Sequence, residues 1–532
     1  MKKQLLLFLL GTCLLPLTGC QDNDPNKIKV SCVSLGYGTT WLRTLMDAYT
    51  KKTGIGFSYT EVVGQSGNNN LNDQLRSLSG ESDIYGCRPG SFYELLYRGS
   101  VQAKGQVYEH AFEPLTDIYN DEYAGETGKN TMLKKMDPLF SNYVEFQNDY
   151  YAVPWANGFV SFVRNLDVWT KFFPVEAYPR TTNELFEMMD TMNTTIASDK
   201  SLSNVSPMIY CSQDEYYTTI IGSWFAQYEG EKQMQKFYAG RDENGKRSTK
   251  LFSYRGATET LQVLDKIVEY NNGKYTYQSQ SSNNLSFTQM QNYFLNGGAA
   301  LCVNGTWLEV ESKEARNKNL DYIKIPLVSS LANSSRLSKT YSEEELREIV
   351  SFIDAHTEVG DNEGAPAGVT TEDLEVLRES RNTGSYMRTD YDHLFMIPAW
   401  SARKQKAKDF LKWMYSDEAL QLFYNTMNGH HLPATLSTGA YDSTGVELSK
   451  FRISCNKVFD EGNYCKYLVN TVKDKIFSIA NVQPNISNTL SKTGNCCNWL
   501  VDGMTPDKII EENTKYLNSK WQSILNIVGE DD

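Results

Sequence analysis

Short apolar segments alternate with amphipathic helical segments from residue 28 onward, and this pattern limits the fold more than any other feature. Ile28, Val30 and Cys32 alternate as in a strand, and a glycine-containing turn follows them. Residues 42–49 then carry apolar side chains at helical spacing, and residues 57–63 again have the pattern of a strand. Repetition of such units predicts an α/β fold, in which ligands bind at the carboxyl ends of parallel strands.

The N-terminus predicts export and attachment to a membrane. Two lysines precede a mainly apolar run at residues 5–17, which is too short to span a bilayer and is typical of a signal peptide. The following Leu-Thr-Gly-Cys, ending at Cys20, resembles a lipobox, in which the cysteine receives lipid and becomes the new N-terminus. We therefore expect a signal peptide at 1–19, a tether at 20–27, and a protein anchored by lipid on the extracytoplasmic face of the cell membrane.

Size and charge restrict the organisation and the partners of the expected mature chain. Its length, 532 minus 19 or 513 residues, is too great for one core and favours two domains. Loss of the two leader lysines changes the formal net charge from −13 to −15, which argues against nucleic acid and anionic lipid surfaces as partners. The eight cysteines other than Cys13 and Cys20 are dispersed, so we expect at most two disulfides, and Cys455 with Cys465 is the pair close enough for a local loop.

The sequence lacks several compact motifs that are typical of catalysis. It has no Gly-x-Ser-x-Gly elbow, no His-Glu-x-x-His helix and no phosphate-binding glycine loop with lysine. His430 and His431 are the only histidine pair, and we expect them in an exposed loop rather than on a shared metal. We therefore predict no catalytic residue, no metal and no cofactor. A glycoside hydrolase stays a remote alternative, because its two carboxylates have no fixed spacing.

Three segments, in this order, carry a resemblance to a known family. Residues 151–155 read Tyr-Ala-Val-Pro-Trp, and residues 294–300 read Phe-Leu-Asn-Gly-Gly-Ala-Ala before Asn-Gly-Thr-Trp at 304–307. Residues 397–419 contain a late amphipathic helix. Together the segments resemble the extracellular solute-binding proteins, family 1. The resemblance implies a two-lobed α/β fold of the periplasmic-binding-protein type, in which each lobe is a sheet flanked by helices and hinge segments join the lobes.

The same resemblance implies boundaries and a function. The first lobe is expected at 28–150 and 327–424, including an insertion at about 329–392, and the second at 151–326 and 425–532. Such a protein is a monomer that captures a small-molecule ligand, here a sugar or oligosaccharide, by cleft closure. It delivers the ligand to the permease subunits of an ATP-binding cassette (ABC) transporter. The open alternatives are a receptor that presents ligand to a membrane sensor, and a binder of a non-sugar solute such as a peptide or polyamine.

Ligand contacts are expected from both lobes. Trp307 matches the aromatic residue of the family motif that stacks on a sugar ring, and Tyr216 resembles a second stacking position. A packing role in a core is the alternative for each aromatic candidate. The candidates that follow strand ends of the first lobe are Tyr37, Thr39, Gln65, Ser66, Arg88 and Ser91, and those that follow the crossover segment are Trp155, Asn157 and Gly158. Asp214 and Trp224 are close to Tyr216 in sequence, and Trp400 matches a loop that approaches ligand in some members of the family.

Overall fold

The computed structural model describes most of the chain. The described residues are 24–88, 90, 92–156, 158–209, 216–268, 285–388, 393–432, 434–465, 474–480 and 496–529. The predictions for the signal peptide, Cys20, Ser91, Asn157 and Asp214 lie outside these residues, as does the side chain of Tyr216. Within them, no helix is both long and apolar enough to cross a membrane.

The first lobe is built on a five-stranded sheet with the order β2-β1-β3-β14-β8. β1 runs parallel to β2 and β3, and β14 runs antiparallel to β3 and β8. Its strands are β1 (Lys27–Ser34), β2 (Gly56–Val63), β3 (Ile84–Cys87), β8 (Val153–Trp155) and β14 (His393–Met396), and two hairpins add β4 (Val101–Ala103), β5 (Gln106–Tyr108), β6 (Glu145–Phe146) and β7 (Asp149–Tyr150). Its helices are α1 (Thr40–Thr53), α2 (Gly64–Arg76), α3 (Phe92–Tyr97), α4 (Thr116–Asn120), α5 (Met132–Lys135), α6 (Pro138–Val144), α17 (Lys404–Met414) and α18 (Asp417–Thr426).

Helix α1 illustrates why these residues form these elements. Trp41, Leu42, Leu45 and Tyr49 are buried at helical spacing, so one face of the helix packs in the core. Gly54 ends the helix with φ 78°, a left-handed conformation that glycine adopts without steric cost, and its N–H donates to Thr50 O. The expected strand–helix–strand unit is therefore present as β1, α1 and β2.

The second lobe contains the sheet β10-β11-β9-β12, and β13 pairs with β9 beside this path. β9 runs antiparallel to β11, β12 and β13. Its strands are β9 (Phe159–Asn165), β10 (Ser206–Ile209), β11 (Ala299–Gly305), β12 (Leu320–Ile323) and β13 (Met387–Arg388). Its helices are α7 (Leu166–Trp169), α8 (Thr182–Ser198), α9 (Tyr216–Glu229), α10 (Glu231–Tyr238), α11 (Arg255–Ile267), α13 (Phe287–Leu295), α14 (Leu308–Glu311), α15 (Glu343–Ala355), α16 (Thr371–Thr383), α19 (Lys450–Glu461), α21 (Cys496–Val501) and α22 (Pro506–Val528), with short 3-10 helices η1 (Lys200–Leu202), η2 (Lys250–Ser253), η3 (Lys313–Asn317) and η4 (Ser329–Asn333).

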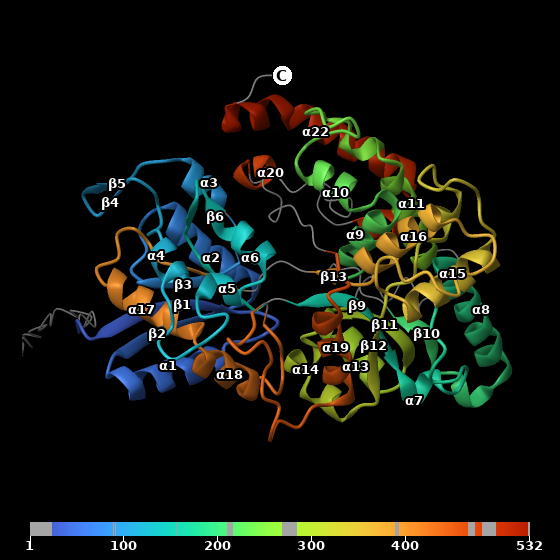
Figure 1. The fold of residues 1–532 in the computed structure, drawn as a ribbon, viewed down its shortest axis with the longest axis horizontal. Coiled ribbons are helices and arrows are strands. Elements are labelled where there is room, and N and C mark those ends of the chain that lie inside the picture. Colours follow the sequence, from blue (N-terminus) through green and yellow to red (C-terminus); the bar gives the residue numbers. More distant parts are fainter. Residues whose placement is uncertain are drawn as a thin grey trace, which may run out of the picture.

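The two sheets lie in separate lobes, and the chain passes repeatedly from one lobe to the other (Figure 1). It passes from β8 to β9, returns from β13 to β14, and passes again from α18 to α19. Each lobe is thus discontinuous in sequence, and the structure is a mixed α/β fold with flanking helices. Closely spaced crossings of this kind let two lobes rotate about a shared hinge.

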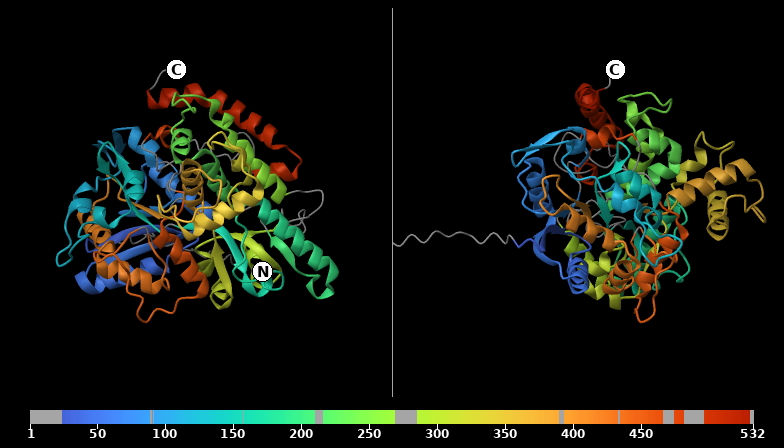
Figure 2. Two further views of the ribbon diagram at one scale, coloured as in Figure 1. Left: turned by 45° about the vertical axis from the view of Figure 1, so that its right-hand side comes forward. Right: turned by 60° about the vertical axis from the view of Figure 1, so that its left-hand side comes forward.

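Residues 329–388 pack on the second lobe, although we expected this insertion in the first. Helix α16 contacts α9, and Arg336 Nη1 donates to Gln227 O at 2.9 Å. Near the end of the segment, Ile325 N donates to Ser385 O at 2.7 Å. In the right-hand view of Figure 2 the insertion, in yellow, projects on the side away from the first lobe. The assignment was wrong because a charged helical pattern does not reveal which lobe its apolar face covers.

The C-terminal segment contacts both lobes (Figures 1 and 2). The short helix α20 (Ile476–Ile479) packs against α3 of the first lobe and against α22. Helix α22 packs along α11 and η2 of the second lobe, and near its end Tyr97 Oη donates to Val528 O at 2.8 Å. The segment expected wholly in the second lobe therefore bridges the two.

The cysteines of the described residues are buried and form no disulfide with one another. They are Cys32, Cys87, Cys302, Cys455, Cys465, Cys496 and Cys497. The loop that we considered between Cys455 and Cys465 is not closed by a disulfide, and Cys465 Sγ lies 3.6 Å from Met234 Sδ instead.

Candidate functional site

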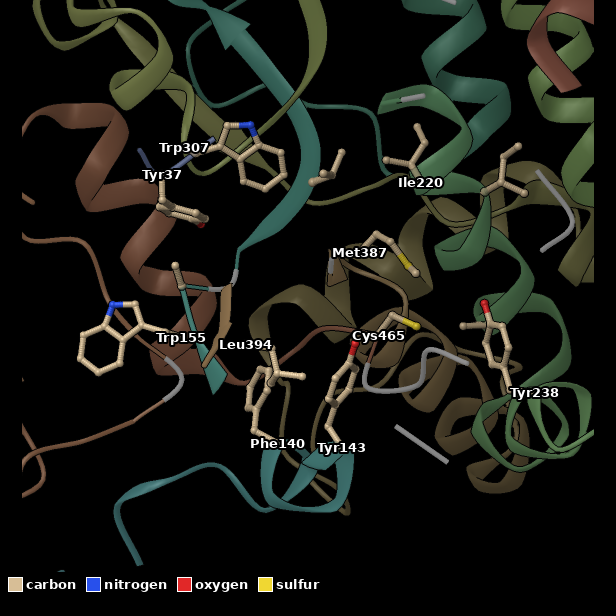
Figure 3. Close-up of a cluster of buried hydrophobic side chains, with 14 of the residues drawn as sticks. Tyr37, Phe140, Tyr143, Trp155, Ile220, Tyr238, Trp307, Met387, Leu394 and Cys465 are labelled. Atoms are coloured by element: carbon tan, nitrogen blue, oxygen red, sulfur yellow. The ribbon is translucent and has the colours of Figure 1, made fainter. Parts of the chain in front are cut away.

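The two lobes meet at an aromatic contact between two predicted site residues, one from each lobe. Tyr37 follows β1 in the first lobe, and Thr306 with Trp307 follows β11 in the second. Tyr37 Oη and Thr306 Oγ1 are 3.1 Å apart and share a hydrogen bond, and the Tyr37 and Trp307 rings meet edge to face at 5.9 Å (Figure 3). Tyr37 is 2% exposed and Trp307 8%, so both rings are covered where the lobes come together.

Gly158, in the crossover from β8 to β9, lies directly against this contact. A Cβ on Gly158 would approach Tyr37 Oη to 2.2 Å, Thr306 Oγ1 to 2.5 Å and Trp307 Cε3 to 3.0 Å. The next residue donates its backbone N–H to Thr306 Oγ1 at 3.3 Å. Only glycine lets the hinge backbone come this close to the aromatic pair.

A buried ion pair supports the turn that carries Trp307. Arg452 of α19 donates from Nη2 to Thr306 O at 2.9 Å and lies 3.2 Å from Glu309 Oε2. Ser449 Oγ also donates to Glu309. Because Arg452 and Glu309 are 1% and 6% exposed in their side chains, the pair fixes the turn through contacts that solvent hardly screens.

His430, at the third crossing, packs beside Tyr37 with the ring centroids 4.5 Å apart. Our expectation of an exposed loop is wrong for this residue, which is fully buried. Burial, together with the charge of Arg452 and the neighbouring His431, lowers the pKa of His430 well below its usual range. The imidazole is therefore neutral at pH 7 in this conformation.

A second polar contact joins the lobes close to the first. Arg388 of β13 donates from Nη2 to Asp137 Oδ2 at 3.1 Å, and Tyr464 Oη donates to the same oxygen at 3.1 Å. Asp137 belongs to the first lobe and caps α6, whereas Arg388 and Tyr464 belong to the second. These three residues were not predicted, and no local sequence pattern distinguishes them.

Three predicted tryptophans lie in cores. Trp155 is fully buried and stacks on Trp41 with centroids 5.3 Å apart and an interplanar angle of 22°. Trp224 donates from Nε1 to Pro326 O at 3.2 Å inside the second lobe. Trp400 donates from Nε1 to Gly80 O at 2.9 Å inside the first. We therefore assign packing roles to these side chains in this conformation.

The remaining predicted residues lie at strand ends of the first lobe. Gln65 and Ser66 are exposed in the first turn of α2, directly after β2, and Arg88 is exposed directly after β3. Thr39 is buried directly before α1. Their position at the carboxyl edge of the sheet agrees with the general location of ligand sites in α/β folds, and their contact with ligand stays a prediction.

Together the elements between the lobes can hold a ligand by rings and hydrogen bonds. The aromatic rings belong to Tyr37 and Trp307, and the hydroxyl of Thr306 is hydrogen-bonded to that of Tyr37. The nearby carboxylates of Glu309 and Asp137 are both engaged with arginines. Such an arrangement suits recognition of a polar solute with apolar faces.

Comparisons with known proteins agree with this architecture. The family described as bacterial extracellular solute-binding protein matches residues 44–443. Among solved structures, an ABC transporter solute-binding protein from Thermotoga lettingae is similar with a TM-score of 0.58 and 11% identity, over 93% of this chain and 99% of that one. MalE3 of T. maritima gives 0.56 and 13% over 93% and 99%, and a probable secreted solute-binding lipoprotein from Streptomyces coelicolor gives 0.58 and 13% over 93% and 100%.

A search of curated protein sequences gives no significant match. The low identities mean that the solved structures support the fold alone. The family match carries more weight, because it spans 400 of 532 residues, counting 44 through 443. It includes the second sheet, the first sheet except β1, and the first two crossings. The chain belongs to the bacterial extracellular solute-binding proteins.

Proposed function

We propose that the protein is a solute-binding lipoprotein that captures a sugar or oligosaccharide between its lobes and delivers it to the permease of an ABC transporter. The observation that carries this proposal is the contact of Tyr37 with Thr306 and Trp307, in which residues from opposite lobes meet beside the hinge glycine. A ligand held by both sides favours the closed form, because only that form provides all of its contacts.

The chemistry of the site supports a saccharide. Sugars have apolar C–H faces that pack on aromatic rings and hydroxyls that exchange hydrogen bonds with neutral polar groups. Related folds also bind sugars: the T. lettingae protein is bound with α-D-tagatose and MalE3 with maltose. Delivery to an ABC permease is supported by the family match and by the T. lettingae protein, which is described as an ABC transporter solute-binding protein.

A thermal-shift screen tests the binding step. Mature protein with Cys20→Ser, which keeps it out of membranes, is heated with mono- and oligosaccharides, peptides and polyamines. A ligand that binds only the folded state raises the melting temperature, so we expect shifts with saccharides. Small-angle scattering should show a smaller radius of gyration with the ligand. Shifts confined to peptides or polyamines would contradict the proposed ligand class.

Trp307→Ala then tests the position of the site. Loss of one stacking ring should weaken saccharide binding by about 1 kcal/mol or more beyond lost buried area, measured by calorimetry. Trp169→Phe is a control, since Trp169 is fully buried away from the lobe contact and packs on Phe173. Unchanged affinity in Trp307→Ala would remove this residue from the site.

The lipid anchor is a separate part of the proposal. Cys20 would carry the lipid, and residues 20–27 would separate the lobes from the membrane. Metabolic labelling with an alkynyl fatty acid should mark the wild-type protein and not Cys20→Ser, and the variant should move from the membrane fraction to the soluble one. Equal labelling of both proteins would contradict lipid attachment at Cys20.

A further inference from the structure

Arg388 occupies an unusual position between the lobes. It lies on β13 and pairs with Phe159, the residue after the hinge glycine, so it is close to the Tyr37–Trp307 contact. Its guanidinium lies 3.9 Å from the ring centroid of Phe140 in the first lobe and 4.7 Å from that of Tyr464 in the second. In Figure 3, Tyr143 of α6 points toward Cys465 of the second lobe, and Phe140 of the same helix lies beside Leu394. Arg388 therefore lies in an aromatic-walled part of the interlobe region.

The hydrogen bonds of this guanidinium are incomplete. Nη2 donates to Asp137 Oδ2 at 3.1 Å and approaches Tyr464 Oη at 3.4 Å. Within the described residues, Nε and Nη1 have no acceptor although the side chain is only 2% exposed. A buried, charged N–H without an acceptor is costly, and the cost disappears when a ligand oxygen accepts from it.

Asp137 determines which kind of oxygen fits. Its carboxylate already balances the charge of Arg388, and its two oxygens accept from Arg388, Tyr464 and the backbone N–H of Leu139. A ligand carboxylate at Nε and Nη1 would add a second negative charge beside Asp137 and would be repelled. A sugar hydroxyl or ring oxygen accepts the same hydrogen bonds without that repulsion.

From these contacts we infer that Arg388 is a ligand-binding residue that donates from Nε and Nη1 to a neutral oxygen of the bound saccharide, and that Asp137 makes the site select neutral over acidic sugars. This inference rests on the proposed function, since it requires a saccharide between the lobes. Beyond the proposed function, it specifies that the ligand is an uncharged saccharide. It also names two residues, Arg388 and Asp137, one from each lobe, that distinguish neutral from acidic sugars.

The test compares neutral with acidic saccharides on three forms of the protein. Calorimetry with maltotriose, raffinose and chitotriose, and with digalacturonate and 3′-sialyllactose, is carried out on wild type, Arg388→Met and Asp137→Asn. We expect wild type to bind a neutral sugar and reject the acidic ones. Arg388→Met should bind that neutral sugar about tenfold to a hundredfold more weakly, because two charge-assisted hydrogen bonds are lost. Asp137→Asn should raise the affinity for acidic sugars relative to neutral ones.

The control is Arg378→Met, which removes another buried arginine from the insertion, where it pairs with Glu375 and Asn362. It should reduce thermal stability without changing sugar affinity. Arg388→Met with wild-type affinity, or a wild type that prefers acidic sugars, would overturn the inference. So would an Asp137→Asn protein with an unchanged neutral-to-acidic ratio, since the pair would then only join the lobes. If no saccharide binds wild type at all, the proposed function itself fails.

Discussion

Single residues decide whether the two lobes can meet at the hinge. The closest approach is at Gly158, where the backbone of the first crossing touches Tyr37, Thr306 and Trp307 at once. Two of these side chains belong to one lobe and the third to the other, and the Tyr37–Thr306 hydrogen bond spans them. A side chain at position 158 would therefore change how the two lobes are positioned relative to each other more than it would change the fold of either lobe.

Gly158→Ala should favour the open form. The added methyl group would lie 2.2 Å from Tyr37 Oη, so Tyr37 must withdraw, and it can do so without unfolding only if the first lobe rotates away. We expect sugar affinity to fall by about tenfold or more, with a larger radius of gyration in small-angle scattering. Gly56→Ala, whose Cβ would meet only Lys27 Cγ at 3.4 Å, should match wild type. Equal affinity of the two variants would show that Gly158 does not control closure.

At the scale of helices and strands, the sequence was informative wherever local periodicity determines structure. The buried face of α1, the strand β1 and the capping of α8 by Thr181 were all predictable from residue spacing. Pairings between distant segments were not. Arg388 and Asp137 are 251 residues apart in the sequence. The local sequence around His430 is typical of a loop and does not indicate that the residue is buried at the hinge. Tyr37 and Trp307 were predicted separately as site residues, since Tyr37 lies in the turn after the first strand and Trp307 in a family motif, but their contact with each other was not predicted.

The lobe on which the insertion packs was also not predictable from local sequence. The ion pairs that hold it there have a measurable effect on stability. Asp354 of α15 accepts from Arg381 Nε at 3.0 Å and Nη2 at 2.8 Å, and Lys324 Nζ lies 3.0 Å away. Burial alone would raise the pKa of Asp354, but the charges of Arg381 and Lys324 outweigh it and lower the pKa to about 2. This network ties the insertion to the strand connection of the second lobe.

The network predicts a specific response to acid. Because the carboxyl pKa is about 2 when folded and about 4 when unfolded, the stabilisation is complete above about pH 4 and is lost as the pH falls toward about 2. Asp354→Asn should lower the free energy of unfolding at pH 7 by about 3 kcal/mol, since it leaves Arg381 buried without a counter-charge. Its stability should also fall less than that of wild type between about pH 4 and pH 2.

Urea unfolding followed by circular dichroism at several pH values measures both effects. Asp73→Asn, which breaks an exposed pair with Arg76, should stay within about 0.5 kcal/mol of wild type. Parallel pH profiles for wild type and Asp354→Asn would contradict the ion-pair explanation.

At the scale of the whole molecule, the C-terminal segment adds a link between the lobes besides the three crossings. Two adjacent residues contact opposite lobes: Asp474 pairs with Arg247 at 2.9 Å in the second lobe, and Lys475 Nζ donates to Asn142 O at 3.0 Å in the first. Lys475 Nζ also lies 4.9 Å from the ring centroid of Tyr93. Because α20 and the end of α22 both contact α3 or its neighbours, opening of the lobes must break or displace these contacts.

Lys475→Met should therefore shift the protein toward the open form while each lobe stays folded. Loss of a hydrogen bond worth about 1 kcal/mol in the closed form lowers the closed population, and so the sugar affinity, by about fivefold. Lys508→Met at the start of α22 is the matched control, since its partner Glu511 lies on the same helix. Spin labels placed one in each lobe, read by double electron–electron resonance, should report a longer mean distance for Lys475→Met only. Identical distance distributions for the two variants would mean that the C-terminal segment follows the lobes rather than restraining them.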